Sequence, residues 1–336
     1  MKRFILLLLV ILSSILLFSC AVQLQTNESF AMDTVIRQTV YASDADVIIQ
    51  NNDILREIEN EMSKTINTSD VSRLNAANGA SVDISAATAQ VLETSLAEAE
   101  KTDGAFSPAL GGVIDAWGFG TENARIPDAE ELSDLLSNAD YKKVTVDPEG
   151  GTASANDMQI DLGGAVKGYA LDRIAENLQQ NNIESAVISL GGSIYAKGTK
   201  PDGSSYKIGI RDPYSGENDY MGTILLEGKF VSTSGIYERG FEKDGVWYHH
   251  IIDPKTGYPA DNGIESVTVV ADSGILSDIY STALFVMGVE TGIEFAQQNG
   301  LDVLYLTKNK EIVTTDGFRE KYDFKVKNTN YREQAA

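Results

Sequence analysis

The chain is poor in the side chains that most often carry metal and nucleophilic chemistry. Its 336 residues include one cysteine and two histidines, which excludes a cysteine-rich zinc module and an intrachain disulfide framework. Any metal must therefore be held mainly by oxygen ligands. Basic residues are also outnumbered, with 27 Lys and Arg against 49 Asp and Glu and a net charge of −22. Such a surface repels a duplex phosphate backbone, which argues against general nucleic-acid binding.

Several common nucleotide-binding and hydrolase motifs are missing as well. No G-x-G-x-x-G follows a predicted strand, and neither G-x-x-x-x-G-K-[ST] nor G-x-S-x-G occurs. A Rossmann fold, a P-loop and a nucleophile elbow are therefore unsupported. With 43% hydrophobic and 23% charged residues, the chain has an ordinary globular composition, and its length suits one large or two modest domains.

The longest apolar run lies at the N-terminus. It covers residues 4–18 after a short basic start, and it is too short to span a bilayer, which takes about 20 residues. The run fits a secretory signal and ends in Leu17-Phe18-Ser19-Cys20, which resembles a bacterial lipobox. We predict a lipoprotein signal peptide over 1–19 and lipidation of Cys20. The alternative is a plain signal peptide with a chance cysteine.

Lipidation would place the protein outside the cytoplasm. Acyl chains on Cys20 would anchor it to a membrane surface by burial of apolar carbon, on the periplasmic side or the outer face of the inner membrane. Residues 20–30 are then expected to be a short polar tether. One folded domain is expected over 31–328, with a polar tail over 329–336.

The domain mixes helix-like and strand-like stretches. Apolar residues recur every fourth position from Val166 to Leu178, which predicts a helix over 164–180. Further helices are expected over 47–62, 86–102 and 277–287. Strands are expected, mostly as hairpins, over 34–41, 142–146 with 158–162, 186–190 with 193–196, 207–210, 223–226, 230–232, 266–270, and 303–307 with 311–314. Because hairpins outnumber strand–helix alternation, we predict an α+β fold with antiparallel sheets and packed helices.

Two segments offer oxygen and backbone ligands. Asp161-Leu-Gly-Gly-Ala-Val-Lys-Gly168 opens the helix predicted over 164–180, and free N–H groups at a helix N-terminus attract anions. Lys167 opposes the helix dipole unless an anion is near; the alternative is a tight turn with a solvated lysine. Asp278-Ile-Tyr-Ser-Thr282 places a carboxylate and a hydroxyl on one helix face, with Ser281 within reach. Such oxygens suit Mg²⁺, although dipole stabilisation and helix back-bonding would equally explain them.

Two further segments carry imidazole and aromatic groups. Trp247-Tyr-His-His-Ile-Ile-Asp-Pro-Lys-Thr-Gly257 holds both histidines of the chain, so any imidazole base is His249 or His250. It would also fit a strand that runs into an ordinary Asp-Pro turn. The stretch from Asp103 to Gly120 offers aromatic surface for a flat ring, or equally for core packing.

In their order along the chain these segments resemble the ApbE family of FAD:protein FMN transferases, which are often periplasmic lipoproteins. The resemblance covers most of the chain after Cys20. The matching segments are Ala31-Met-Asp-Thr34, Met62-Ser-Lys-Thr65, Ser72-Arg-Leu-Asn75, Asp103-Gly-Ala-Phe106, Trp117-Gly-Phe-Gly120, Asp161-Leu-Gly-Gly164, Ser189-Leu-Gly-Gly192, Ser232-Thr-Ser-Gly235, His250-Ile-Ile-Asp253-Pro-Lys-Thr-Gly257, and Asp278 with Thr282.

The resemblance implies a set of site residues. For Mg²⁺ it implies the Gly164 carbonyl, Asp278 and Thr282, to which we add Ser281. For contacts with the substrate FAD it implies Met32, Thr65, Ala105, Phe106, Ser107, Asp161, Lys167 and Ile252. His250 and Asp253 match the motif nearest the reacting centre. Two positions depart from the family's pattern, because Ser107 stands where many relatives carry Asp and Thr65 where an aromatic residue is common.

The implied reaction is phosphoryl transfer. A threonine hydroxyl of a partner protein attacks the FMN phosphorus of FAD, AMP leaves, and His250 is our hypothesis for the base. The implied acceptors are exported or membrane-bound subunits of redox-driven ion pumps. Two alternatives stay open: a Mg²⁺-dependent FAD pyrophosphatase that yields FMN and AMP, and a lipoprotein that binds FAD without chemistry.

Overall fold

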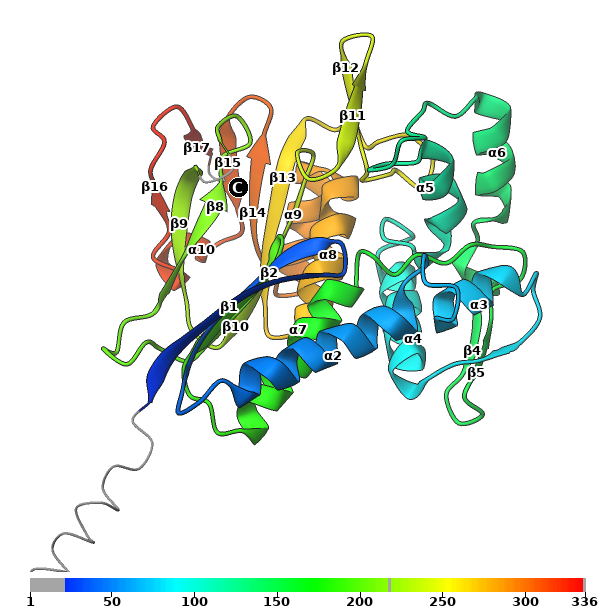
Figure 1. Cartoon of the computed structure of the whole chain (residues 1–336). Coiled ribbons are helices and arrows are strands. Elements are labelled where there is room, and N and C mark those ends of the chain that lie inside the picture. The colour runs from blue at the N-terminus through cyan, green and yellow to red at the C-terminus, as the bar shows by residue number, and fades with distance from the viewer. Residues whose placement is uncertain (1–21, 217–218, 335–336) are drawn as a thin grey trace, which may run out of the picture.

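The computed structural model describes residues 22–216 and 219–334 (Figure 1). The predicted signal peptide over 1–19 and the predicted lipidation site Cys20 lie outside these ranges. Within them, no helix combines the length and apolar character needed to cross a membrane.

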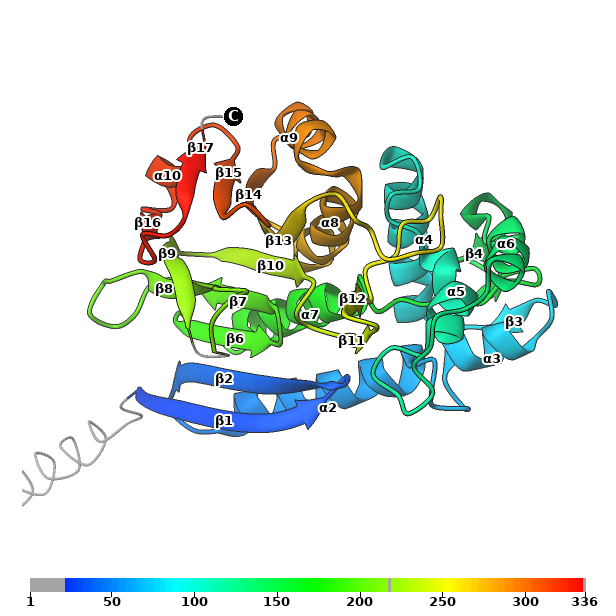
Figure 2. The same cartoon turned by 90° about the horizontal axis from the view of Figure 1, so that it is seen from above.

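A nine-stranded sheet forms the centre of the molecule and is seen strand by strand in Figure 2. Its spatial order is β1 (Gln23–Ala31), β2 (Thr34–Ala42), β6 (Ala186–Leu190), β7 (Ser193–Lys197), β10 (Lys229–Gly235), β13 (Ile264–Ala271), β14 (Asp302–Thr307), β15 (Glu311–Thr314) and β17 (Arg332–Gln334). All neighbours pair antiparallel except β15 and β17. The predicted α+β class with antiparallel sheets is confirmed.

Helices cover one face of this sheet. They are α2 (Asp46–Met62), α7 (Val166–Gln180), α8 (Gly274–Met287) and α9 (Val289–Gln298). Alternate strand residues such as Ile188 and Phe230 pack against the apolar face of α7, including Ile174. The helices predicted over 47–62, 164–180 and 277–287 are therefore present, because their apolar residues repeat at helical spacing and meet one sheet.

The opposite face of the sheet packs on a smaller layer. It consists of a three-stranded sheet of β8 (Tyr206–Arg211), β9 (Tyr220–Leu226) and β16 (Lys325–Val326), with α10 (Phe318–Lys321) beside it. Val231, Val270 and Leu304 face this layer, whereas their neighbours Phe230 and Val269 face the helices. This alternation follows from the two-residue repeat of a strand.

The remaining elements gather at one side of the sheet, on the right in Figures 1 and 2. They are α3 (Asp70–Ala76), α4 (Ala86–Lys101), α5 (Gly111–Trp117), α6 (Ala129–Asn138), the 3₁₀ turns at 108–110 and 141–143, and a small sheet of β3 (Val82–Asp83), β4 (Thr145–Asp147) and β5 (Thr152–Ser154). A hairpin of β11 (Gly240–Lys243) and β12 (Val246–His249) projects above them in Figure 1.

The expected polar tether over 20–30 is wrong from residue 23 onward. Residues 23–31 form β1, which pairs with β2 along its whole length. The packed side of β1 is polar, because Asn27 and Ser29 contact the Asn52 side chain of α2. A strand held by amide and hydroxyl groups lacks the apolar alternation by which strands are recognised in a sequence.

The expected polar tail over 329–336 is also partly wrong. Residues 332–334 form β17, and the buried Tyr331 hydroxyl donates to Asp212 at 2.7 Å. The second strand expected over 158–162 lies instead at β5, residues 152–154. The backbone at Ile160 bonds to the Asn75 side chain, whose Oδ1 accepts from its N–H at 2.7 Å.

Candidate functional site

The site is built around the Asp278 carboxylate, which is buried in the second turn of α8. Its Oδ2 accepts from the Gly168 N–H of α7 at 3.1 Å, and its Oδ1 accepts from the Ser193 hydroxyl of β7 at 3.1 Å. The Lys167 ammonium lies 3.7 Å from Oδ2. One carboxylate thus joins the beginning of α7, the beginning of β7 and a cation.

The two hydroxyls that follow on α8 differ in their surroundings. Ser281 is buried and donates to the Asp278 carbonyl at 2.8 Å, so its hydroxyl is used within the helix. Thr282 is partly exposed, and its Oγ1 lies 3.2 Å from Ser234 Oγ of β10. Ser234 also lies 2.8 Å from Ser281 Oγ. Of the two hydroxyls predicted from the sequence, only the partly exposed Thr282 is open to a ligand.

Gly164 lies directly beside Thr282. A Cβ at position 164 would be 3.6 Å from Thr282 Oγ1 and 3.1 Å from the ring of Phe106. The buried Phe106 ring therefore packs against the backbone at Gly164. Two predicted metal ligands from distant parts of the chain, Gly164 and Thr282, are brought together here.

These donors fit a small divalent cation. A carboxylate, a hydroxyl and a backbone carbonyl are hard oxygen ligands of the kind that Mg²⁺ takes. Within residues 22–216 and 219–334, no group of three or more His, Cys, Asp or Glu is placed to hold a metal. With Asp278 as the single acidic ligand, the rest of the shell has to come from substrate phosphate and water. The Lys167 ammonium, 3.7 Å from Asp278 Oδ2, places one positive charge beside this carboxylate.

A second charged pair lies at the 161–164 turn. Asp161 Oδ1 accepts from the Gly163 N–H at 2.7 Å, and its Oδ2 lies 2.8 Å from the Lys64 ammonium, which also contacts Asp115. Burial raises the pKa of Asp161, but the Lys64 charge and the Gly163 N–H hold it below its usual value. Asp161 is therefore an ionised acceptor held in a fixed orientation.

The Lys64 ammonium is stabilised by the same contacts. Burial lowers the pKa of Lys64, whereas the charges of Asp161 and Asp115 raise it above its ordinary value. Lys167, beside this turn, donates to the Gly163 carbonyl at 3.1 Å. The two cations thus flank the glycine turn, and a bound pyrophosphate would meet positive charge there.

Met32 lies at the tip of the β1–β2 hairpin. Met32 and Asp33 both have positive φ, at 53° and 55°, which is the geometry of a two-residue type I′ turn usually occupied by Asn or Gly. The Met32 N–H donates to the Glu59 carboxylate of α2 at 2.8 Å. Non-glycine residues held in this region are costly and concentrate at functional sites.

Three of the predicted FAD contacts lie in turns. The exposed Thr65 has its hydroxyl 3.0 Å from Ser63 Oγ. Ala105 is partly buried, and Ser107 caps the 3₁₀ turn at 108–110, where its Oγ accepts from the Ala109 N–H at 3.3 Å. The Ser107 hydroxyl therefore has a local structural partner.

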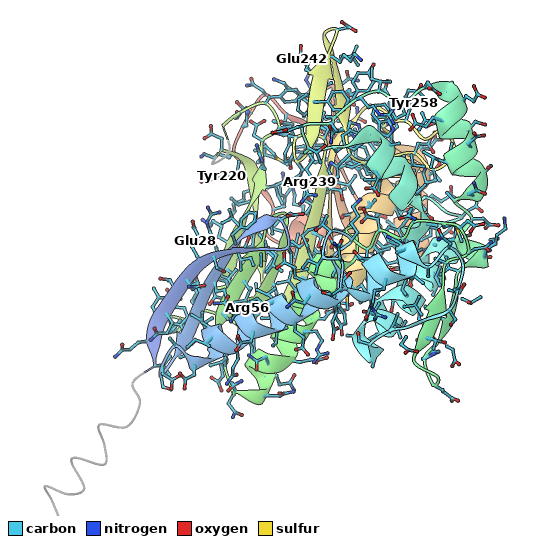
Figure 3. All side chains as sticks on the ribbon, turned by 45° about the vertical axis from the view of Figure 1, so that its right-hand side comes forward. Glu28, Arg56, Tyr220, Arg239, Glu242 and Tyr258 are labelled. Carbon is cyan, nitrogen blue, oxygen red and sulfur yellow. The ribbon has the colours of Figure 1, made fainter. Side chains whose placement is uncertain are left out.

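His250 follows directly after β12, which ends at His249. Its backbone N–H donates to the Arg239 carbonyl at 3.1 Å, and its Nδ1 lies 3.2 Å from the same oxygen. Burial lowers the pKa of the imidazole to about 4; the hydrogen bond to Arg239 opposes this, and the charges of Arg239 and Lys167 lower it further. A neutral ring that donates from Nδ1 leaves Nε2 free to accept a proton. Figure 3 shows Arg239 at the base of the projecting hairpin.

Asp253 and Ile252 shape the loop after His250. Asp253 Oδ1 accepts from the Lys255 N–H at 2.9 Å, and its carbonyl accepts from the Gly257 N–H at 2.8 Å, which closes the turn. The Ile252 side chain is buried in a cluster with Trp117, so any ligand contact of Ile252 involves its backbone. Trp117 in turn donates its indole N–H to the Gly257 carbonyl at 2.8 Å.

Four residues of the site were not identified from the sequence: Lys64, Ser193, Ser234 and Arg239. Lys64 and Ser234 lie inside the quoted segments Met62-Ser-Lys-Thr65 and Ser232-Thr-Ser-Gly235, and Ser193 directly follows Gly191-Gly192. Their positions carried a signal, but their partners are distant in the chain. The role of Arg239, which acts through its backbone carbonyl, has no signal in residue type.

Comparison with known proteins identifies the family. The ApbE family model matches residues 32–305. A protein from Treponema pallidum named FAD:protein FMN transferase is 34% identical over 281 residues, which are 79% of this chain and 78% of that protein. One of the same name from Klebsiella pneumoniae is 33% identical over 244 residues, 72% of this chain and 75% of that protein.

Comparison with solved structures points to the same family. The crystal structure of an ApbE protein from Thermotoga maritima superposes with a TM-score of 0.83 at 33% identity and covers 89% of this chain and 99% of that one. The flavin transferase ApbE from Vibrio cholerae gives 0.78 at 26% identity, with 89% and 99% covered. The order of the segments, the fold and the relatives agree, and the chain belongs to the ApbE family, whose matching relatives are enzymes named FAD:protein FMN transferase.

Proposed function

We propose that the protein transfers FMN from FAD to a threonine hydroxyl of another protein and releases AMP in a Mg²⁺-dependent reaction. The observation that carries this proposal is the convergence of Asp278 and Thr282 of α8 with the Gly164 backbone, beside the Lys167 ammonium. A site with one carboxylate and adjacent cations is suited to a substrate that brings its own phosphate ligands.

The residues of the chain have separate tasks in this reaction. Asp278, Thr282 and the Gly164 carbonyl would hold Mg²⁺, which when bound offsets negative charge on the pyrophosphate. Lys167 contributes a second positive charge, and Asp161 accepts hydrogen bonds from the nucleotide. Phe106, Met32 and the other predicted contacts would line the flavin nucleotide.

His250 takes the proton of the acceptor hydroxyl. Its free Nε2 accepts the proton as the threonine oxygen forms a bond to the FMN phosphorus. The bond from that phosphorus to the AMP oxygen breaks, and AMP leaves with the electron pair. The product is FMN joined to threonine by a phosphoester. The Asp253 carboxylate contributes by closing the turn that follows His250.

The setting that we propose is outside the cytoplasm. Lipidation at Cys20 would tether the enzyme to a membrane surface, where exported or membrane-bound redox proteins, such as subunits of redox-driven ion pumps, would be its acceptors. The lipobox-like Leu17-Phe18-Ser19-Cys20 supports this setting, because the single cysteine of the chain stands at the position that lipidation requires.

The test uses the soluble form that begins after Cys20, with FAD, Mg²⁺ and an acceptor domain that presents a threonine. The intact mass of the acceptor and the release of AMP are measured together. We expect one FMN on the acceptor for each AMP released. AMP and free FMN without labelling, across several acceptors, would instead identify a pyrophosphatase, and neither product would identify an FAD-binding protein.

A further inference from the structure

Helices α7 and α8 touch through two glycines. A Cβ on Gly168 would lie 2.1 Å from the Gly274 carbonyl oxygen, and a Cβ on Gly274 would lie 2.2 Å from the Gly168 carbonyl oxygen. No side chain fits at either position, so the two backbones are in direct contact at the first turn of each helix. The metal-site residue Asp278 lies one turn beyond this contact.

Across the contact, each helix also provides a carboxylate that accepts hydrogen bonds from the other helix. Asp278 of α8 accepts from the Gly168 N–H of α7 at 3.1 Å. Asp172 of α7 accepts from the Gly274 N–H at 2.6 Å, the Ile275 N–H at 2.9 Å and the Ser273 hydroxyl at 3.3 Å. Each carboxylate therefore binds free N–H groups at the beginning of the other helix, where the helix dipole favours negative charge.

The sequence repeats the same spacing in both helices. Gly168-Tyr-Ala-Leu-Asp172 and Gly274-Ile-Leu-Ser-Asp278 are both Gly-x-x-x-Asp, which places each glycine and its aspartate on one helix face. The crossing is therefore a reciprocal pair: glycine against glycine, with each aspartate on the partner's N-terminus. One aspartate of the pair faces the site and the other faces away from it.

We propose that Asp172 is a positioning residue that fixes the first turn of α8 and thereby sets Asp278 and Thr282 against Gly164. This inference rests on the proposed function, because it assigns Asp172 to the Mg²⁺ site without contact to any ligand. Residues that orient metal ligands in this way commonly change metal affinity by about tenfold or more when they are removed.

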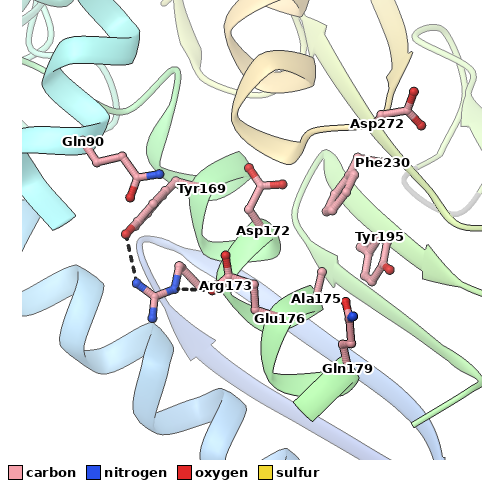
Figure 4. Close-up of a pocket in the computed structure, with 10 residues that line it drawn as sticks. All are labelled: Gln90, Tyr169, Asp172, Arg173, Ala175, Glu176, Gln179, Tyr195, Phe230 and Asp272. Atoms are coloured by element: carbon pink, nitrogen blue, oxygen red, sulfur yellow. Dashed lines mark hydrogen bonds and ion pairs between the residues drawn. The ribbon is translucent and has the colours of Figure 1, made fainter. Parts of the chain in front are cut away.

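The surroundings of Asp172 make the inference testable. Asp172 borders a cavity of about 330 Å³ that is also lined by Glu176, Tyr195 and Phe230 (Figure 4). Water from this cavity would reach the N–H groups of Gly274 and Ile275 if the carboxylate were removed. These two N–H groups would then donate to water instead of the carboxylate. We therefore expect Asp172→Ala to fold.

The experiment compares Asp172→Ala and Asp172→Asn with Glu176→Gln as the matched control. Glu176 lies one turn further along α7, lines the same cavity and contacts Arg173 Nε at 3.1 Å. The melting temperature of the FAD-loaded protein is measured against Mg²⁺ concentration, and FAD binding is measured without Mg²⁺. A second Mg²⁺ titration follows the rate of FMN transfer.

For Asp172→Ala we expect the Mg²⁺ concentration at half effect to rise about tenfold or more in both titrations, with FAD binding in the absence of Mg²⁺ unchanged. Asp172→Asn keeps one acceptor oxygen and should fall between Asp172→Ala and the wild type. Glu176→Gln should match the wild type. Excess Mg²⁺ should restore much of the rate to Asp172→Ala.

A uniformly lower melting temperature with an unchanged Mg²⁺ midpoint would show a purely structural role and overturn the inference. If Asp172→Ala does not fold, the Mg²⁺ midpoint of Asp172→Asn tests the inference in the same way. A wild-type protein that binds FAD but responds to Mg²⁺ in neither titration would contradict the proposed function itself. The two failures are thus distinguished by the wild-type titration.

Discussion

At the residue scale, the state of His250 decides what it can do. Its imidazole is neutral near pH 7 because burial lowers its pKa to about 4, and its Nδ1 faces the Arg239 carbonyl. A histidine in this state is a base with a free Nε2 and an orientation fixed by the backbone. The same ring in solution would be partly charged at pH 6.5 and free to rotate.

The first prediction concerns this ring. His250→Asn keeps a polar group that can face the Arg239 carbonyl but removes the proton acceptor at Nε2. We expect FMN transfer to fall by about 10²-fold or more, with FAD affinity nearly unchanged. Rates of acceptor labelling and FAD binding by fluorescence measure the two effects. Transfer at the wild-type rate would mean that another group takes the proton.

The second prediction follows from the neighbouring His249, whose buried ring packs edge-on against Phe285. Burial lowers its pKa to about 4, against 6.5 in the unfolded chain. The unfolded chain then binds more protons between these values, so stability is full above pH 6.5 and falls as pH drops toward 4. Each such histidine contributes about 1.4 kcal/mol per pH unit within this window.

His249→Asn tests this directly, because the Asn amide oxygen can replace Nδ1 as acceptor of the Ile251 N–H but does not titrate. Free energies of unfolding are measured in urea at pH 7, 6, 5 and 4.5. We expect the loss of stability on acidification to be smaller in the variant. Parallel curves for the two proteins would show that His249 is not buried as a neutral ring.

At the element scale, α7 and α8 act as one unit because their backbones meet at Gly168 and Gly274. Helix crossings of this closeness tolerate no added carbon on either side. The position of α8, and with it the alignment of Asp278 with Thr282, therefore depends on residues that contact no ligand.

The third prediction is that Gly168→Ala costs about 3 kcal/mol of stability or more, because its Cβ would overlap the Gly274 carbonyl oxygen. The helices would have to separate, and we expect Mg²⁺-dependent FAD binding to weaken as well. Gly216→Ala is the control, since the nearest described atom to a Cβ there is Asp219 Oδ2, at an ordinary 3.5 Å. Urea unfolding gives the first quantity and an FAD titration with Mg²⁺ the second. Equal stability of both variants would contradict the direct backbone contact.

The elements also show why some of the fold could be predicted from the sequence and some not. The α7 helix was predicted because its apolar residues repeat every fourth position and all meet one sheet. By contrast, β1 was missed because Asn27 and Ser29 contact the Asn52 amide of α2 rather than apolar carbon. Residues 158–162 have a strand-like apolar pattern, but their backbone bonds to the Asn75 side chain and to the backbones of Pro108 and Gly111. Only the tertiary structure supplies these partners.

The same distinction holds for the site. Asp278 and Thr282 could be paired from the sequence because a spacing of four positions places both side chains on one helix face. Ser193 and Lys64 could not, since their partners Asp278 and Asp161 lie 85 and 97 positions further along the chain. The roles assigned to the site residues stay predictions until the variants are measured.

At the scale of the whole molecule, an aromatic cluster joins the helical side to the loop after His250. Trp117 of α5 stacks on Phe119 with ring centroids 5.4 Å apart, and it meets Tyr248 of β12 and Tyr258 at 5.5 Å each. Its indole N–H donates to the Gly257 carbonyl. The buried Trp117 side chain therefore contacts the hairpin, α5 and the 253–257 turn at once.

The fourth prediction is that Trp117→Phe lowers stability by about 1–3 kcal/mol, because the Gly257 carbonyl loses its donor within a buried cluster. We also expect a lower rate of FMN transfer, since the loop that follows His250 loses its anchor. Trp247→Phe is the matched control: its indole is 44% exposed and donates to the Ile236 carbonyl at the surface. Unfolding curves and transfer rates of the two variants make the comparison. A larger loss of stability for the exposed position would refute the role of the cluster.

The same cluster gives the protein an internal optical probe. The chain has two tryptophans, of which Trp117 is fully buried and Trp247 faces solvent. In Trp247→Phe, all indole emission would come from one ring that is bonded to the turn after His250. Stopped-flow mixing with FAD or with an acceptor would then time the response of this turn in milliseconds, without any attached dye.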